Sequence, residues 1–192
     1  MTARQTRRRA ARPAPRQPAR GTRRFVILTG LSGSGKTHAI RALEDLGYFC
    51  VDNLPSSLIP TMAELARRDD AGLDKVAIVV DVRESRFLTE FPRVYRRLRT
   101  TPGVEPRLIF LEAAPSVLVR RFSETRRPHP LAPNRSVTEG ITEEREKLHA
   151  IRAMADLIID TSNLTVHELR QSFMRMSRDR RARADMIVTF ES

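Results

Sequence analysis

The sequence contains a single cysteine, Cys50, and no apolar run long enough to cross a membrane. One cysteine cannot form a disulfide within the chain, and its apolar neighbours favour a small buried residue over a nucleophile. The arginines near the start are followed by Ala, Pro and Arg rather than by an apolar segment, so neither a Sec nor a twin-arginine export signal is expected. These absences favour a cytoplasmic protein without a membrane partner.

Acidic residues are absent from the first 24 positions, which hold nine arginines. Because the net charge of the chain is +12, the other 168 residues carry only +3 and the globular part is mildly basic. Pro13, Pro15 and Pro18 interrupt any helix in this stretch, which also lacks large apolar residues beyond Met1. We predict a disordered arginine-rich arm over residues 1–23, which is either a solvated tail or an arm that binds RNA or DNA phosphates.

From residue 24 onward, short β-prone runs alternate with longer stretches of helical periodicity, which is typical of βαβ units on a parallel sheet. The predicted strands span residues 25–29, 48–52, 76–81, 107–112 and 156–160. The predicted helices lie near residues 36–46, 55–68, 89–99, 115–127, 138–155 and 165–178. Since 40% of the residues are hydrophobic, we expect a real core and one three-layer α/β domain over residues 24–192.

The last predicted helix has apolar residues at three- and four-residue steps, at Val166, Leu169, Phe173 and Met176. We expect this stripe to pack on the sheet, with Arg170 and Arg175 in solvent. A further apolar, β-prone run occupies residues 186–192 and stops without a turn or a cap. The architecture is therefore expected to continue past it.

The segment GLSGSGKT matches the phosphate-binding pattern G-x-x-x-x-G-K-[ST], and it lies between a predicted strand and a predicted helix, as the mechanism requires. Its glycines permit positive φ and close backbone approach, so that successive N–H groups can converge on phosphate oxygens beside a helix N-terminus. The lysine would neutralise the β- and γ-phosphates, and the threonine hydroxyl would ligate Mg²⁺. The predicted nucleotide-binding residues of this loop are Gly30, Leu31, Ser32, Gly33, Ser34, Gly35, Lys36 and Thr37.

A second carboxylate for the metal is expected at the end of a neighbouring apolar strand, and Asp81 is placed there. Asp81 is therefore a candidate Mg²⁺ ligand together with Thr37, although an aspartate that ends a strand is also a common cap. Arg83 and Glu84 follow directly and can reach the same crevice.

Asp52 ends the predicted strand that follows the phosphate-loop helix, a position from which small kinases often address the phosphate acceptor or orient water. It is a candidate general base. The alternative is a turn, because Asp52, Asn53 and Pro55 are turn-forming residues and Asn53 could cap the next helix.

The segment LVRRFSETRRPHPL places Arg120, Arg121, Arg126 and Arg127 on or just after a helix and then breaks the helix with prolines. This arrangement resembles a kinase lid, whose arginines stabilise charge on the transferring phosphoryl group. Arg126 and Arg127 are therefore candidate catalytic residues with Lys36 and Asp52. The alternative is a solvated helix face. His129 alone does not indicate a metal site.

Five segments together resemble the RapZ family of bacterial nucleotide-binding proteins, also called RNase adapters. They are GLSGSGKTHAIRALEDLGYFCVDNLP, VVDVRE, ETRRPHPL, ADLIIDTSNLTVHELR and VTFES, and they occur in the order that the family presents them. The resemblance implies a kinase-like P-loop NTPase domain with a mostly parallel sheet. It also implies binding and weak hydrolysis of ATP and GTP by residues 30–37 and by a second nucleotide segment, Asp81, Val82, Arg83 and Glu84.

In some members of that family the whole protein also binds small RNA and guides an RNase to it, a role that depends on a C-terminal domain beyond the family's FES sequence. We expect that domain to be absent here, because the chain ends at FES. The alternatives are therefore an ATPase or GTPase, an RNA- and protein-binding adapter that uses nucleotide as a signal, and a small-molecule kinase. Self-association into a homo-oligomer is left open. No N-K-x-D motif favours GTP alone.

Overall fold

A computed structural model describes residues 22–68, 71–82, 87–178 and 187–188 of the protein, without the side chains of residues 177–178 and 187–188. Almost all of the arginine-rich arm, and both Arg83 and Glu84, lie outside the described residues. Arg23, placed in the arm by its sequence, instead begins the first strand.

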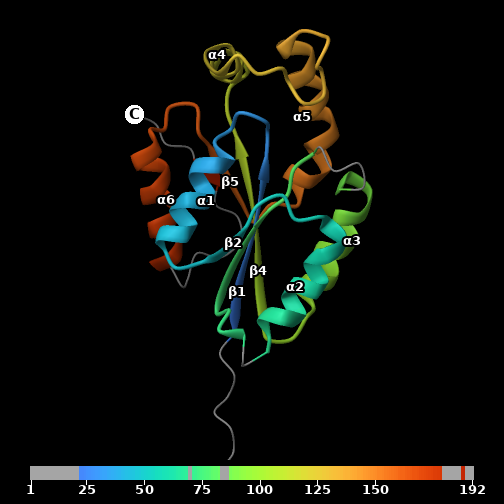
Figure 1. The fold of residues 1–192 in the computed structure, drawn as a ribbon, viewed down its shortest axis with the longest axis vertical. Helices are drawn as coiled ribbons and strands as arrows, with labels where there is room; N and C mark the ends of the chain where they lie inside the picture. The colour runs from blue at the N-terminus through green and yellow to red at the C-terminus, as the bar shows by residue number, and fades with distance from the viewer. Residues whose placement is uncertain (1–21, 69–70, 83–86, 179–186, 189–192) are drawn as a thin grey trace, which may run out of the picture.

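The centre of the molecule is a parallel six-stranded sheet with the strand order β2-β3-β1-β4-β5-β6 (Figure 1). The strands are β1 Arg23–Gly30, β2 Phe49–Val51, β3 Lys75–Val79, β4 Val104–Glu112, β5 Leu157–Asp160 and β6 Ile187–Val188. The five predicted strands are all present, and β6 falls in the β-prone run near the end of the chain. The predicted three-layer α/β fold with a mostly parallel sheet is confirmed.

The sheet is buried on both faces because its strands carry continuous apolar runs. Side chains of β1 alternate between the faces, so that Phe25 and Ile27 enter one core cluster while Val26 and Leu28 enter the other. The first cluster includes residues of α2, α3, α4 and α5, and the second includes residues of α1 and α6. Helices therefore cover both faces of the sheet (Figure 1).

The helices are α1 Lys36–Asp45, a 3₁₀ turn η1 Ser56–Leu58, α2 Ile59–Ala66, α3 Phe87–Arg99, α4 Pro115–Thr125, α5 Val137–Ala153 and α6 Val166–Arg178. The longest, α5, begins with a capping box in which Ser136 and Glu139 satisfy each other's backbone N–H groups. Helix α4 ends two residues earlier than predicted because Arg126 adopts a left-handed conformation, with φ of 52°.

The apolar stripe predicted on α6 is confirmed at Leu169 and Phe173, which are buried, and at Met176, which packs partly against the same core cluster. The prediction was wrong for Val166, which is 57% exposed. This valine begins α6 beside the cavity described below, so it lines that cavity instead of packing on the sheet. Arg170 and Arg175 are exposed, as predicted.

Candidate nucleotide-phosphate site

The loop between β1 and α1 has the backbone conformation that its glycines were predicted to permit. Gly30, Gly33 and Gly35 all have positive φ values, of 141°, 81° and 98°. At Gly30 an added Cβ would lie 2.1 Å from the carbonyl oxygen of Leu111 on β4, so a side chain has no room there. Gly35 is the left-handed N-cap of α1, which leaves the first N–H groups of the helix directed toward the loop.

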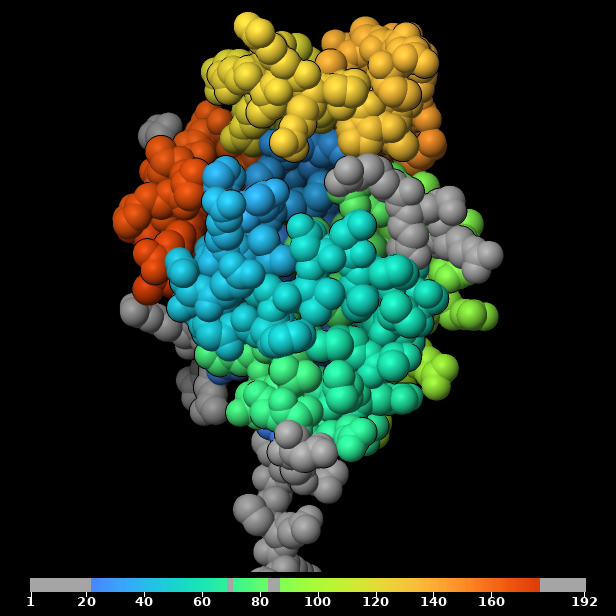
Figure 2. Space-filling model, viewed as in Figure 1, coloured from blue at the N-terminus to red at the C-terminus, as the bar shows by residue number. Residues whose placement is uncertain are grey.

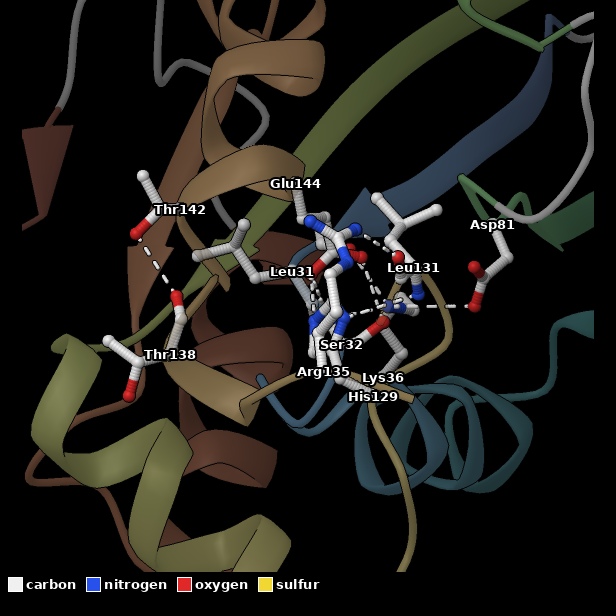
Figure 3. A network of polar contacts seen from close by, with 11 residues as sticks. Leu31, Ser32, Lys36, Asp81, His129, Leu131, Arg135, Thr138, Thr142 and Glu144 are labelled. Carbon is white, nitrogen blue, oxygen red and sulfur yellow. Dashed lines mark hydrogen bonds and ion pairs between the residues drawn. The ribbon is translucent and has the colours of Figure 1, made fainter. Parts of the chain in front are cut away.

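Lys36 folds back over this loop (Figure 3). Its Nζ atom donates hydrogen bonds to the carbonyl oxygens of Gly30 at 2.8 Å and Leu31 at 3.1 Å, and lies 3.8 Å from the Asp81 Oδ2 atom. The two charged side chains are only 11% and 8% exposed. A cation and a carboxylate predicted from separate motifs therefore meet at the carboxyl edge of adjacent strands, where ligands gather in parallel sheets.

A cavity of about 680 Å³ opens beside the loop, and most of the predicted site residues line it. In the space-filling view the blue loop region lies beneath the yellow residues of α4 and the segment after it (Figure 2). The lining includes residues 32–37, Asp52, Asp81 and Arg127. Leu31 and Val82 are instead buried in the core cluster that includes α2 and α3. Arg126, an exposed residue just after α4, is not among the lining residues.

The turn interpretation of residues 52–55 is supported by their geometry. Asn53 has φ of 55°, which asparagine tolerates better than most residues. The prediction that Asn53 caps the next helix was wrong, because η1 begins at Ser56 with Pro55 at the capping position. Asp52 is exposed and lines the cavity, so its proposed role as a general base stays a prediction.

Two residues that the sequence did not single out as a pair, Arg121 and Thr161, hold the loop from the α4 side. The Arg121 guanidinium donates to the Gly33 carbonyl at 3.0 Å, to the Thr161 hydroxyl at 3.1 Å and to the Thr161 carbonyl at 2.7 Å. The Thr161 hydroxyl in turn donates to the Ser34 carbonyl at 2.9 Å. Burial, followed by the charge of neighbouring Arg120, lowers the pKa of Arg121, which nevertheless stays a cation at neutral pH.

Glu144 of α5 also contacts the loop, and the sequence analysis did not identify it. Glu144, fully buried, accepts from the backbone N–H of Ser32 at 2.8 Å and from the Ser32 hydroxyl at 2.8 Å (Figure 3). The same carboxylate lies 3.3 Å from the Nε2 atom of His129, which is also fully buried. Sequence patterns gave little signal for this contact, because Ser32 and Glu144 are 112 positions apart.

The lining suits a magnesium ion that is carried by phosphate groups better than one held by the protein alone. Within the described ranges, no group of three or more His, Cys, Asp and Glu side chains is arranged to hold a metal. Thr37 and Asp81 line the same cavity and supply a hydroxyl and a carboxylate, the small oxygen set that Mg²⁺ uses when phosphates and waters complete its shell. The buried Ser34 hydroxyl also lacks a hydrogen-bond partner among the described residues, as a missing ligand would leave it.

Comparison with known proteins agrees with this geometry. Residues 24–181 match the sequence model of a protein family, the RapZ-like N-terminal domain. The chain belongs to this family. A curated relative from Solibacter usitatus, called a nucleotide-binding protein, is 52% identical over 164 residues, which cover 85% of this chain and 50% of the relative. A nucleotide-binding protein from Acidobacterium capsulatum is 48% identical over 161 residues, which cover 84% of this chain and 51% of that relative. This RapZ-like chain thus spans about half the length of these relatives.

The fold of this RapZ-like domain is that of the P-loop kinases. The crystal structure of shikimate kinase from Bacteroides thetaiotaomicron has a TM-score of 0.55 and 16% sequence identity, over 80% of this chain and 97% of the kinase. At that identity the likeness establishes the fold and not the substrate. Across the described residues, no helix combines the length and apolar character that crossing a membrane requires.

Proposed function

We propose that this domain binds a nucleoside triphosphate with Mg²⁺ at residues 30–37 and hydrolyses ATP and GTP slowly. The observation that carries the proposal is the meeting of Lys36 and Asp81, 3.8 Å apart, over a phosphate loop whose three glycines have positive φ. The names of the relatives, which are nucleotide-binding proteins, point to the same ligand class.

Different groups of the site would bind the phosphates and the magnesium ion. The N–H groups of Gly33, of Gly35 and of the first turn of α1 would face the β- and γ-phosphate oxygens, whereas the Ser32 N–H donates to Glu144. The Lys36 ammonium, which now donates to two loop carbonyls, would exchange one of these bonds for a phosphate oxygen. Thr37 and Asp81 would hold Mg²⁺, directly or through water, and the ion would neutralise charge on the phosphates.

The proposal of slow hydrolysis rests on two cavity-lining side chains that can act on a water molecule and on the γ-phosphate. Asp52 lines the cavity and can orient a water molecule, while Arg127, which also lines it, can stabilise charge on the γ-phosphate. Both side chains are exposed in the structure, so neither is preorganised for the transition state. ATP and GTP are both proposed, since the sequence has no guanine-reading N-K-x-D motif.

The test is phosphate release and fluorescent-nucleotide binding, each with ATP and GTP, with and without Mg²⁺. Lys36→Ala should weaken triphosphate binding by about a hundredfold, because a cation at the phosphates is lost. The matched control is Lys147→Ala, which removes an exposed lysine on α5 that pairs with Glu143. Equal affinity in the Lys36→Ala and wild-type proteins would overturn the proposal.

A small-molecule kinase is the second candidate, because Asp52, Asn53 and Arg127 line the same cavity as the phosphate loop. This candidate predicts that an added acceptor raises nucleotide consumption well above the hydrolysis rate, and screening hydroxyl compounds under the same assay tests it. Small-RNA binding, an RNase partner, homo-oligomer formation and a cytoplasmic location stay predictions for the whole protein.

A further inference from the structure

Glu144 connects two segments that both border the cavity. One is the phosphate loop, through the two bonds from Ser32. The other is the connection between α4 and α5, residues 126–136, which we call the α4–α5 segment; it contributes Arg127, Pro128 and Pro130 to the cavity lining. His129, which is fully buried, lies among these residues in the sequence, and its imidazole contacts Glu144 (Figure 3).

The hydrogen bonds assign the tautomer of His129. Its Nδ1 atom accepts from the backbone N–H of Leu131 at 3.2 Å, so Nδ1 carries no proton and the proton is on Nε2. The Nε2–H group can then donate to Glu144, 3.3 Å away. The carboxylate therefore accepts three hydrogen bonds, two from Ser32 and one from His129. A fully buried carboxylate needs such donors to offset the loss of its hydration.

A glycine in the first turn of α5 makes room for this imidazole. A Cβ on Gly140 would lie 2.4 Å from the His129 Nδ1 atom and 2.9 Å from the Ala132 Cβ atom. Glycine inside a helix costs about 0.5–1 kcal/mol relative to alanine. The ring also packs on Phe122 of α4, with 5.1 Å between ring centroids. His129 is thus enclosed by α4 and α5, and its orientation toward Glu144 is fixed.

The order of the three groups excludes a nucleophilic triad. In a triad the imidazole stands between the hydroxyl and the carboxylate, so that it removes the hydroxyl proton. Here the carboxylate stands between Ser32 and His129, and the hydroxyl only donates to it. The arrangement orients its partners and activates neither.

We infer that Glu144 is a positioning residue that couples the phosphate loop to the α4–α5 segment, so that nucleotide phosphates on the loop steady Arg127 at the cavity. Ser32 directly follows the two carbonyls that hold Lys36, so fixing Ser32 also fixes the lysine's acceptors. At the other end of the connection, Arg127 is two residues from His129. The part of this inference that involves nucleotide rests on the proposed function.

The coupling is tested first without nucleotide, by hydrogen–deuterium exchange in peptides that cover residues 29–38 and 126–136. Glu144→Ala leaves three buried donors unpaired, and exchange should quicken by about tenfold or more in both peptides. Glu144→Gln should stay within about threefold of wild type in both, because its amide can accept from the Ser32 N–H and His129 and can donate to the Ser32 hydroxyl. The matched control, Glu146→Ala, removes an exposed carboxylate on the same helix and should change neither peptide.

Transmission is tested with ATP and Mg²⁺, which should slow exchange in residues 126–136 of the wild-type protein. His129→Asn keeps an acceptor near the Nδ1 position but loses the donor to Glu144, and should abolish this protection. His129→Gln places an amide N–H near the Nε2 position and should retain it. Nucleotide affinity should change by less than about threefold in both variants, since both keep the two hydrogen bonds by which Glu144 holds Ser32 of the loop.

Three results would overturn the inference: quicker exchange in only one of the two peptides of Glu144→Ala, full ATP-dependent protection in His129→Asn, or equal loss of protection in His129→Asn and His129→Gln. The last would assign His129 a role in packing alone. Failure of the wild-type protein to bind ATP would refute the proposed function, and the nucleotide-free comparison would still decide whether Glu144 couples the two segments.

Discussion

Replacing Arg121 with alanine removes a side chain that joins α4 to the phosphate loop and to the residue after β5. Its guanidinium donates to Gly33 in the phosphate loop and to both the hydroxyl and the carbonyl of Thr161 after β5. Two of these bonds are partly buried and the one to Gly33 is exposed. With about 1 kcal/mol for each, the substitution should lower the free energy of unfolding by about 2–3 kcal/mol.

Arg120, the neighbouring residue, supplies a control because it has the same charge and lies in the same helix. Arg120 is 66% exposed and lies 3.9 Å from Glu124 one turn later in α4, so Arg120→Ala should cost about 0.5 kcal/mol or less. Arg121→Lys should recover only part of the loss, because an ammonium cannot span the three acceptors as a guanidinium does.

Thermal and urea unfolding, followed by circular dichroism, compare Arg121→Ala, Arg121→Lys and Arg120→Ala with the wild-type protein. For a chain of this size, a loss of 2–3 kcal/mol corresponds to a fall in Tm of about 5–10 °C. Triphosphate affinity should fall with it, because the Gly33 carbonyl is no longer held. Equal Tm and affinity in Arg121→Ala and Arg120→Ala would refute the argument that Arg121 braces the loop.

Three further predictions concern single residues. Gly30→Ala should lower the free energy of unfolding by about 4 kcal/mol or more, because the added Cβ would lie 2.1 Å from the Leu111 carbonyl oxygen. Gly72 also has a positive φ but has no atom within 4 Å of an added Cβ, so Gly72→Ala should lower the free energy of unfolding by only about 1 kcal/mol. Urea unfolding compares the two variants. Burial, followed by the charge of a nearby glutamate, raises the pKa of Cys50 from 9.0 to about 12, so at pH 8 a thiol reagent should react about a thousandfold more slowly with the folded than with the unfolded protein. Because the unfolded state loses this proton first, stability should fall as the pH rises above about 9, and an ordinary alkylation rate in the folded protein would contradict the assignment. Asp52→Asn should retain triphosphate binding and lower phosphate release by about a hundredfold, and an unchanged rate would remove Asp52 as the base.

The fold and the phosphate loop could be predicted from sequence because both depend on neighbours in the chain. A strand, a glycine-rich loop and a helix follow each other within residues 23–45, and the positive φ values belong to glycines. Asp81 was found by the same local rule, that a polar residue after a buried strand lies at the sheet's carboxyl edge. The error at Val166 has the opposite origin, since helical periodicity gives the direction of a side chain but not where the sheet ends.

The supports of the loop could not be predicted in this way. Ser32, Gly33 and Ser34 are held through polar atoms by side chains of α5, α4 and the end of β5, at separations of 112, 88 and 127 positions. Glu144 looks like an ordinary residue of a helix surface in the sequence, and Arg121 was considered only as one of four arginines of a kinase-like lid or a solvated helix face. Only the fold shows that Glu144 is buried and that Arg121 reaches the loop.

The residues of the phosphate-binding motif and the distant residues that bond to the loop contribute differently to nucleotide binding. In the proposed function, the phosphate-binding pattern specifies which backbone groups would face the phosphates. We expect Glu144, Arg121 and Thr161, which bond to the loop, to determine how firmly those groups are held before a nucleotide binds. Binding energy is lost whenever a loop must be ordered at the moment of binding. Two chains with the same eight-residue motif can therefore differ in affinity and in turnover, and substitutions at these three supports should change both while leaving every residue of the motif in place.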